Sequence, residues 1–384
     1  MIGNIEYMQR AIRLAQKGLY STEPNPRVGC VIVRDDKIVG EGWHQRAGEG
    51  HAEVNALQQA GDKAQGASVF VTLEPCSHTG KTPPCADALI TAGVKKVYAA
   101  MLDPNPLVAG NGLKKLQAAN IETECGLLEA QAQALNPGFI KRMHEGRPFV
   151  RVKLAMSLDG RTAMASGESK WISSEASRND VQRLRAESSA ILTGIGTVLA
   201  DNPSMNVRLP AESTDLHWQR AVSDENVKLV QPKRIVLDSQ FKLASAMTGK
   251  EFNIFSRKGE SDGGECIVYT TIDVEDRARY PFTIDTIDAE SGRIDLHQLM
   301  KQLADREVNL LHVEAGSLLC GALLKNDLVD EIVVYMAPHI MGDGAKGLFH
   351  LPELESMKDR ISLDIKDVRA IGKDIRITAV PVLS

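Results

Sequence analysis

Four side chains in the first third of the chain could together support metal-assisted hydrolysis. His51 and Glu53 stand two residues apart, while Cys76 and Cys85 each follow a proline. One imidazole and two thiolates suit a tetrahedral zinc ion, and three protein ligands leave its fourth position open, as in catalytic sites. Zinc lowers the pKa of a water ligand to about 7, and Glu53 would carry the proton from that water to a leaving group. We therefore predict zinc ligands at His51, Cys76 and Cys85 and a proton shuttle at Glu53.

This arrangement is typical of zinc-dependent deaminases, with one difference in spacing. The general deaminase pattern has two residues between its cysteines, whereas Ser77 to Pro84 separate the two cysteines here. A longer loop can still close on one metal, but it brings His78 near as a competing ligand. The alternative is a pair of buried thiols and a histidine at a helix start. The two Pro-Cys pairs beside His-Ala-Glu favour the metal site.

The composition of the chain is that of a globular protein with reduced thiols. Of its 384 residues, 43% are hydrophobic and 25% charged, and the net charge is −5. Such a chain lacks the positive field of sequence-tolerant nucleic-acid binders. It shows no secretory signal and no apolar run of the ~18 residues that a membrane span needs. Six cysteines are too few for a disulfide scaffold. We therefore expect a cytoplasmic enzyme with no nucleic-acid or membrane partner, and buried, apolar roles for the remaining cysteines: Cys30, Cys125, Cys266 and Cys320.

Alternating strand and helix signals position the predicted zinc ligands. Residues 51–60 are expected to form a helix that Gly61 ends, and residues 84–92 a second helix that begins beside Cys85. A helix N-terminus favours a thiolate, which suits the role predicted for this cysteine. Valine-rich segments at residues 67–73 and 94–101 are expected to be strands. This order of elements implies an α/β fold with a helix-covered sheet.

A domain boundary is predicted near residue 146, which gives a deaminase domain 1–146 and a second domain 147–384. The second domain also alternates strands and helices, but no Gly-x-Gly-x-x-Gly follows its first strand, which argues against a Rossmann domain. Instead, residues 314–317 follow a strand and begin a helix, where free backbone N–H groups could bind cofactor phosphates. Gly194 and Gly196 offer a second close approach. Residues 211–231 lack periodicity and are expected to form an exposed insertion.

Motifs in both parts resemble the bifunctional riboflavin-biosynthesis deaminase-reductase of bacteria. In the first domain the resemblance rests on residues 24–29, 51–54, 72–78, 82–85 and 103–106: Pro-Asn-Pro-Arg-Val-Gly, His-Ala-Glu-Val, Thr-Leu-Glu-Pro-Cys-Ser-His, Thr-Pro-Pro-Cys and Asp-Pro-Asn-Pro. In the second it rests on residues 153–160, 169–172, 196–203 and 313–316: Lys-Leu-Ala-Met-Ser-Leu-Asp-Gly, Ser-Lys-Trp-Ile, Gly-Thr-Val-Leu-Ala-Asp-Asn-Pro and Val-Glu-Ala-Gly. Both halves occur in the family's order, and the wide cysteine spacing is what this family shows.

The resemblance implies a two-step enzyme with two α/β folds. A cytidine-deaminase-like three-layer domain would remove the 2-amino group of 2,5-diamino-6-(5-phosphoribosylamino)pyrimidin-4-one. A dihydrofolate-reductase-like domain would then use NADPH to reduce the ribosyl side chain, giving 5-amino-6-(5-phosphoribitylamino)uracil. The implied cofactors are one Zn²⁺ per chain and NADPH, the implied partner is this small phosphoribosyl pyrimidine, and the chain could form a homo-oligomer.

The resemblance also implies binding residues in both domains. The deaminase pocket would be lined by Asn25, His44, Lys81, Thr82 and Asn105. The reductase would bind its substrate, with two arginines at the sugar phosphate, through Ser169, Arg185, Met205, Arg208 and Glu314. It would bind NADPH through Ala155, Trp171, Thr197, Asp201, Gly316, Ser317 and Gly321. Lys153 is unusual in an otherwise apolar strand, and we predict that it polarises or protonates the sugar oxygen during hydride transfer.

The sequence also allows non-functional roles for these residues and other functions for the chain. Lys81 and the two arginines could be solvated charges, and a tryptophan is more often part of a core. Deaminases that edit tRNA share the zinc motif, although the negative net charge and the long second domain disfavour that function. A structural zinc module joined to a nucleotide-binding module would need no base such as Glu53. A chain with only one active domain is a further alternative.

Overall fold

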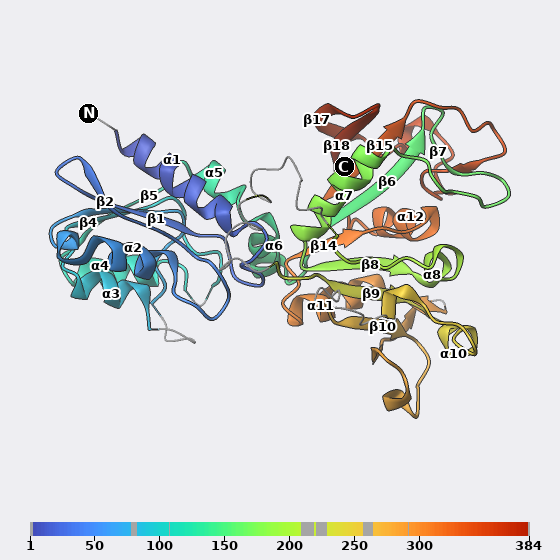
Figure 1. Ribbon diagram of the computed structural model, residues 1–384, viewed down its shortest axis with the longest axis horizontal. Helices are drawn as coiled ribbons and strands as arrows, with labels where there is room; N and C mark the ends of the chain where they lie inside the picture. Colours follow the sequence, from blue (N-terminus) through green and yellow to red (C-terminus); the bar gives the residue numbers. More distant parts are fainter. Residues whose placement is uncertain are drawn as a thin grey trace. The chain divides into compact units, whose positions relative to one another are not determined.

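The computed structural model describes residues 3–77, 83–106, 108–208, 219, 229–255, 264–290 and 292–382. The chain divides into two compact units (Figure 1). The first ends at Gly146 and also contains Val230, and the second begins at Arg147. Across these described ranges, no helix has both the length and the apolar character needed to cross a membrane.

The first unit is a three-layer α/β/α sandwich (Figure 1). In sheet order its strands are β2 (Lys37–Trp43), β1 (Gly29–Arg34), β3 (Ser68–Val71), β4 (Lys96–Ala99) and β5 (Glu122–Cys125). β1 runs antiparallel to β2 and β3, and β3, β4 and β5 are parallel. One face packs against α2 (Ala52–Ala60), α3 (Cys85–Thr91) and α4 (Asn111–Ala118). The other face packs against α1 (Asn4–Ala15), α5 (Glu129–Gln133) and α6 (Pro137–Glu145).

Small residues let α2 approach the sheet closely. The helix buries Ala52, Ala56 and Ala60, which lie four residues apart and so share one face. Gly42 on β2 faces this row, and a Cβ there would lie 2.3 Å from the Ala52 carbonyl oxygen. Only glycine permits such an approach. This contact fixes the start of α2, where His51 is the N-cap residue.

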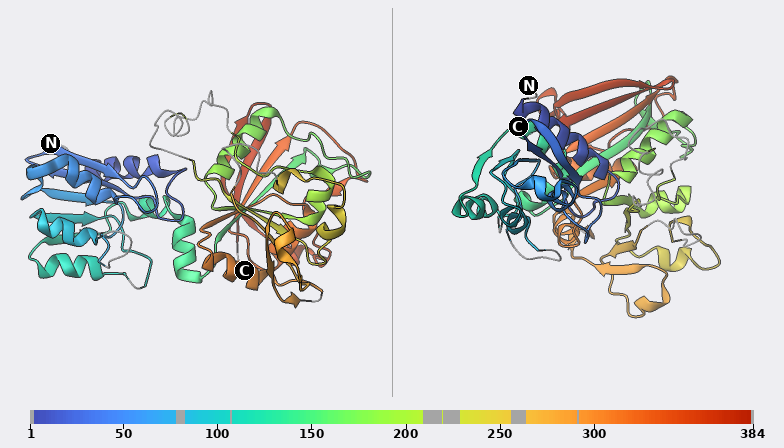
Figure 2. Two further views of the ribbon diagram at one scale, coloured as in Figure 1. Left: turned by 60° about the horizontal axis from the view of Figure 1, so that its bottom comes forward. Right: turned by 60° about the vertical axis from the view of Figure 1, so that its left-hand side comes forward.

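The second unit is built on one mixed sheet that has helices on both faces (Figures 1 and 2). In sheet order its strands are β11 (Thr283–Thr286), β10 (Cys266–Thr270), β9 (Lys233–Leu237), β8 (Ala190–Gly194), β14 (Leu310–Val313), β6 (Phe149–Ser157), β15 (Glu331–Ala337), β18 (Asp374–Pro381) and β17 (Leu363–Ile371). The strands from β11 to β15 pair in parallel, whereas β18 and β17 are antiparallel additions. Two short ribbons accompany the sheet: β7 (Arg161–Ala163) with β16 (Lys346–Gly347), and β12 (Ala289–Glu290) with β13 (Arg293–Ile294).

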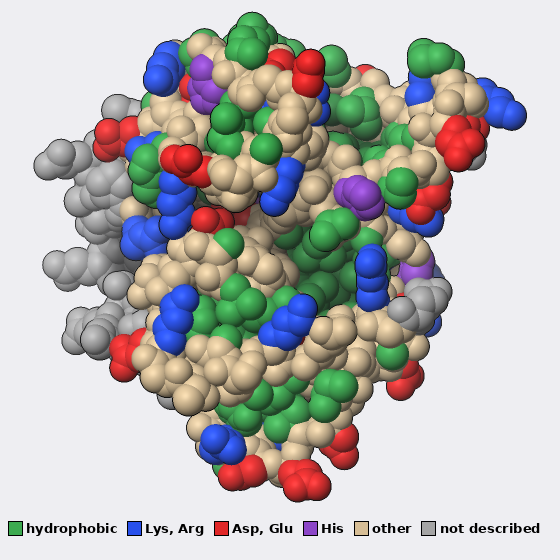
Figure 3. Space-filling model, turned by 90° about the vertical axis from the view of Figure 1, so that its right-hand side faces the viewer, with side chains coloured by type: hydrophobic (Ala, Val, Ile, Leu, Met, Phe, Trp, Pro, Cys, Tyr) green, Lys and Arg blue, Asp and Glu red, His purple; other side chains and the backbone are tan. Residues whose placement is uncertain are grey.

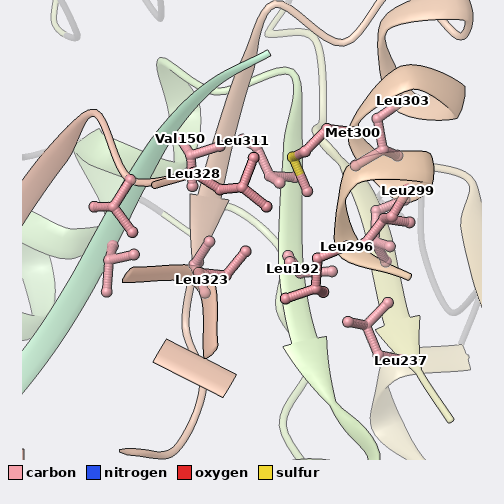
Figure 4. Close-up of a cluster of buried hydrophobic side chains, with 14 of the residues drawn as sticks. Val150, Leu192, Leu237, Leu296, Leu299, Met300, Leu303, Leu311, Leu323 and Leu328 are labelled. Atoms are coloured by element: carbon pink, nitrogen blue, oxygen red, sulfur yellow. The ribbon is translucent and has the colours of Figure 1, made fainter. Parts of the chain in front are cut away.

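The largest core of this unit lies between the sheet and two helices, α11 (Leu296–Asp305) and α12 (Ser317–Lys325). Figure 4 shows Val150, Leu192 and Leu311 of the strands meeting Leu299 and Leu323 of these helices. Because side chains alternate along a strand, the residues between these apolar positions face the opposite side. That side is covered by α7 (Glu175–Ala186), α8 (Ile195–Asp201) and α10 (Leu243–Ala246).

The expected elements around the metal ligands are present, with shorter bounds at the strands. The predicted helices 51–60 and 84–92 are α2 and α3, and the predicted strands 67–73 and 94–101 are β3 and β4. The prediction of a buried Cys125 is wrong: this thiol is exposed, because it ends the edge strand β5. Cys30, Cys266 and Cys320 are buried as expected. The predicted insertion at residues 211–231 lies mostly outside the described residues.

Candidate functional site

The predicted metal ligands come together in the first unit. His51 caps α2, Cys76 lies in the segment after β3, and Cys85 is the first residue of α3. Nδ1 of His51 is 3.2 Å from Sγ of Cys85 and 3.6 Å from Sγ of Cys76. The three potential ligand atoms all lie within 4.8 Å of one another. One imidazole and two sulfurs at this separation fit a tetrahedral zinc ion. The competing candidate His78 lies outside the described residues.

Local hydrogen bonds prepare this cluster for a cation. The Cys85 thiol, the His51 ring and the Cys85 backbone N–H, 3.3 Å from Sγ, all lower the pKa of Cys76. The same contact with Cys76 raises the pKa of His51, although burial opposes it. Cys76 is therefore the thiolate of the pair before a metal binds. A free N–H at the start of a helix stabilises negative charge on the sulfur.

Glu53 is the second residue of α2, in the first turn of the helix, and is 3% exposed. Burial, followed by the nearby Cys76 thiolate, raises the pKa of Glu53 to about 7. A carboxyl group with such a pKa exchanges protons readily near neutral pH. The rest of α2 is apolar or small on its buried side, so a buried acid at this position indicates chemistry rather than packing.

Two predicted substrate residues lie beside the metal ligands. His44 follows β2 and is 2% exposed, and its ring meets that of His51 edge-on with centroids 5.3 Å apart. Its Nδ1 lies 3.2 Å from the Gly50 carbonyl oxygen and its Nε2 lies 3.1 Å from Nδ2 of Asn25. Donation from Nδ1 to the carbonyl leaves Nε2 as the acceptor from Asn25. Burial lowers the pKa of His44 to about 4, so this ring is neutral at physiological pH.

Glu74 ties the loop that carries Asn105 to the segment that carries Cys76. This buried carboxylate accepts four backbone N–H groups, from Asp103 at 3.1 Å, Gly110 at 2.8 Å, Gly112 at 2.8 Å and Leu113 at 3.2 Å. Asn105 itself is half-buried on this loop, and its N–H donates to Asp103. The sequence analysis did not single out Glu74, although it stands inside the Thr-Leu-Glu-Pro-Cys motif. Lys81 and Thr82, the other predicted pocket residues, lie outside the described residues.

A Glu74→Gln variant should show how much the deaminase depends on this loop. Glutamine replaces one acceptor oxygen with a donor, so two backbone N–H groups would lose their partner. Each buried unsatisfied group costs about 1–3 kcal/mol. We expect a lower unfolding midpoint for the first unit and a several-fold higher deaminase KM, with reductase rates unchanged. Glu122→Gln, at an exposed side chain on β5, is the matched control. Wild-type stability and KM in Glu74→Gln would refute this role.

A cavity of about 830 Å³ opens in the second unit beside the strand ends of β6, β8 and β14. Figure 3 looks onto this unit, where apolar side chains line a hollow. Eight predicted residues line the cavity: Lys153, Ala155, Ser169, Thr197, Asp201, Glu314, Gly316 and Ser317. Among the lining residues that the sequence analysis missed are two at the rim, Lys346 on β16 and His350. Neither belongs to a motif that marks a binding site.

Two helices begin at this cavity with a glycine beside the first residue, so no side chain there covers the backbone N–H groups. Gly196 lies in the first turn of α8 and Gly316 is the N-cap residue of α12, and both line the cavity. A Cβ built on either glycine would have no atom within 4 Å. Free N–H groups at helix starts bind phosphate. The volume and this open cradle fit a dinucleotide such as NADPH.

The Glu314 carboxylate on the cavity wall is paired with Arg185. Arg185, on α7, donates from Nε to Oε1 of Glu314 at 2.5 Å and from Nη2 to Oε2 at 2.9 Å. Burial opposes ionisation of Glu314, but Arg185 outweighs it and holds the pKa of this carboxyl well below its usual range. Nη1 of Arg185 donates to the Asn206 carbonyl at 3.1 Å. The guanidinium is thus engaged by the protein, and the exposed Arg208 is the freer of the two predicted phosphate-binding arginines.

Three other predicted residues, Met205, Trp171 and Gly321, are not among the residues that line the cavity. Met205 is buried, and Trp171 is 72% exposed with the Arg178 guanidinium 4.5 Å above its ring. The indole is therefore not part of the core. Gly321 is buried on α12, where a Cβ would lie 2.4 Å from the His350 carbonyl oxygen. This glycine lets α12 pack against the backbone that carries His350.

Comparison with known proteins covers both units. A family model described as the RibD C-terminal domain matches residues 148–377, and a second, described as the cytidine and deoxycytidylate deaminase zinc-binding region, matches residues 1–101. The riboflavin biosynthesis protein RibD of Escherichia coli strain K12 is 50% identical over 371 residues, covering 96% of this chain and 97% of that protein. The chain belongs to the RibD family. The Haemophilus influenzae relative is 48% identical over 382 residues, covering 98% and 96% of the two chains.

Solved structures agree with this assignment. The Acinetobacter baumannii RibD structure, form 1, matches with a TM-score of 0.86 and 43% identity over 99% of both chains. A Thermotoga maritima structure matches with a TM-score of 0.80 and 32% identity over 99% of both chains. The RibD family combines a zinc-dependent deaminase with an NADPH-dependent reductase in riboflavin biosynthesis, and this chain is such a bifunctional enzyme. The predicted fold class, function and cofactors are thereby confirmed, and the match to the RibD reductase domain disfavours a tRNA-editing enzyme.

Proposed function

We propose that the first unit hydrolyses the 2-amino group of 2,5-diamino-6-(5-phosphoribosylamino)pyrimidin-4-one. The second unit then reduces the sugar of the deaminated product with NADPH, giving 5-amino-6-(5-phosphoribitylamino)uracil. The Thermotoga maritima relative carries the name diaminohydroxyphosphoribosylaminopyrimidine deaminase/5-amino-6-(5-phosphoribosylamino)uracil reductase, which supports both substrates. The negative net charge supports a small-molecule substrate over a nucleic acid, and the free thiols support a reducing compartment such as the cytoplasm.

The observation that carries the deaminase proposal is a buried acid beside a cluster of metal ligands. His51, Cys76 and Cys85 would hold zinc, which supplies the Lewis acidity that makes water a nucleophile at neutral pH. Glu53 takes a proton as the nucleophile attacks the carbon that bears the amino group, and returns it to the departing nitrogen, so ammonia leaves. Asn25, held by the hydrogen bond between its Nδ2 and Nε2 of the neutral His44, would orient the pyrimidine.

In the reductase, the helix starts at Gly196 and Gly316 would hold NADPH, which would supply the hydride that reduces C1′ of the sugar as its bond to the ring oxygen is cleaved. The ring oxygen then needs a proton to become the hydroxyl of the open ribityl chain. Lys153 lines the cavity next to Glu314, and it would donate this proton from its ammonium group. Glu314, held by Arg185, would accept hydrogen bonds from sugar hydroxyls. Arg208 would bind the sugar phosphate.

Metal removal tests how the two steps are linked. Purified enzyme given the diaminopyrimidine and NADPH should oxidise NADPH, and chelation of the metal should stop this oxidation. Supplying the deaminated intermediate, 5-amino-6-(5-phosphoribosylamino)uracil, should restore NADPH oxidation in the chelated enzyme. Cys85→Ala should behave like the chelated enzyme, and exposed Cys125→Ala like the wild type. NADPH oxidation that persists without metal on the diaminopyrimidine would contradict the proposed order of reactions.

A further inference from the structure

Glu314 has a second neighbour that the reductase proposal does not use. Nε2 of His312 lies 3.4 Å from Oε1 of Glu314, the same oxygen that accepts from Nε of Arg185. His312 and Glu314 are separated by one residue on β14 and its continuation, so both side chains point to the same face of the sheet. The carboxylate is thus held by α7 on one side and by the sheet on the other.

His312 is an unusual occupant of its position. Its side chain is 0% exposed, and its strand neighbours Leu311 and Val313 and its β8 partner Ile191 are buried and apolar. Among the described residues, neither ring nitrogen makes a fully formed hydrogen bond. A buried polar group without a partner costs about 1–3 kcal/mol, so an aliphatic side chain would be more stable here. The contact between Nε2 and Oε1 of Glu314 is the polar interaction that a histidine makes here and an aliphatic side chain could not.

The charged groups around the His312 ring determine its protonation state. Arg151 is paired with His312 on β6 and binds Glu187 and Glu331, and Arg185 reaches in from α7. Burial lowers the pKa of His312, and both arginines act in the same direction against the contact with Glu314. The ring is therefore neutral, and a proton on Nε2 would turn its polar N–H edge toward Oε1.

We propose that His312 is a positioning residue of the reductase. Through the 3.4 Å contact of its Nε2 with Oε1, it works with Arg185 to fix the plane of the Glu314 carboxylate, so that the remaining lone pairs face the sugar hydroxyls of the phosphoribosyl substrate. This inference rests on the proposed role of Glu314 in binding that sugar.

The test is a steady-state comparison of His312→Leu and His312→Gln in the full-length enzyme, with the deaminated intermediate and NADPH as substrates. Leucine removes the polar contact with Oε1, and we expect the KM for the phosphoribosyl substrate to rise several-fold, as loss of one net polar contact of about 1 kcal/mol implies. The KM for NADPH and the deaminase rate should not change. Glutamine carries a donor near the Nε2 position and should restore most of the affinity. Ile191→Val, at the adjacent buried position, is the packing control.

Two results would overturn the inference. One is a wild-type KM for the phosphoribosyl substrate in His312→Leu. The other is an equal rise in the KM for the phosphoribosyl substrate in both His312 variants, together with a changed KM for NADPH. That result would indicate a purely structural role. Glu314→Gln separates this inference from the proposed function. If Glu314→Gln binds the sugar poorly while His312→Leu keeps the wild-type KM, only the role of His312 is rejected. If Glu314→Gln binds the sugar normally, the role of Glu314 is rejected, and this inference with it.

Discussion

Replacement of Glu53 by glutamine should lower the deaminase kcat by about 10²–10⁴-fold, the usual contribution of a general acid–base group. Glutamine fills the same buried space on α2 but cannot take up and release a proton. His51, Cys76 and Cys85 are left in place, so the variant should keep its metal. The measurement is ammonia release from the diaminopyrimidine, together with the zinc content of the purified protein.

The same chain provides the control for this experiment. With the deaminated intermediate as substrate, the Glu53→Gln enzyme should oxidise NADPH at the wild-type rate, because Glu53 belongs to the first unit and the reductase cavity is lined by residues of the second. Glu49→Gln, at an exposed position in the segment before His51, should leave both activities unchanged. Wild-type ammonia release by Glu53→Gln would exclude a proton-shuttle role, and loss of zinc would assign this residue to metal retention instead.

The metal cluster was predictable from the sequence because two of its three ligands, His51 and Cys85, stand at helix starts that local signals mark. Gly61 ends the helix that His51 begins, and proline precedes the helix that Cys85 begins. Once both helices pack on the same face of one sheet, their starts must lie near each other. The four-fold hydrogen bonding of Glu74 was not predictable in this way, because its partners are backbone groups of a loop about 30 to 40 residues further along the chain.

In the second unit, the sequence indicated the strand-to-helix turns but not the pairing of charges. The segments around Gly196 and Gly316 carry the signal of a strand that runs directly into a helix, and the structure places both at the cavity. Arg185 and Glu314 are 129 residues apart, and their contact depends on α7 packing against the sheet. In the sequence, Arg185 is one charged residue on a charged face of a helix. In the folded chain, it binds the Glu314 carboxylate. His312 lies between the apolar residues Leu311 and Val313 in the sequence, and it contacts Glu314 because residues two apart share one face of a strand.

Replacement of Lys153 by methionine should lower the reductase kcat by about 10²-fold or more, with little change in the KM for NADPH. The lysine stands on β6 at the cavity wall, with its Nζ 5.9 Å from the centre of the Tyr335 ring. Methionine keeps the length and apolar stem of the side chain but has no proton to give to the sugar oxygen. Lys366→Met, at an exposed side chain on β17, should behave like the wild type. Normal kcat and KM values in Lys153→Met would contradict the proposed role.

The dependence of the reductase on pH provides a second, independent test of Lys153. Burial lowers the pKa of this ammonium group below its usual value, and the attraction of Glu314 opposes only part of that shift. Because a proton donor must be protonated, the fraction of active wild-type enzyme falls as the pH rises through this lowered pKa. The wild-type kcat should therefore decline on the alkaline side, below the pH at which an ordinary lysine titrates. The residual activity of Lys153→Met should lack this decline, since the titrating group is gone. An alkaline limb that persists unchanged in the variant would place the proton donor elsewhere in the cavity.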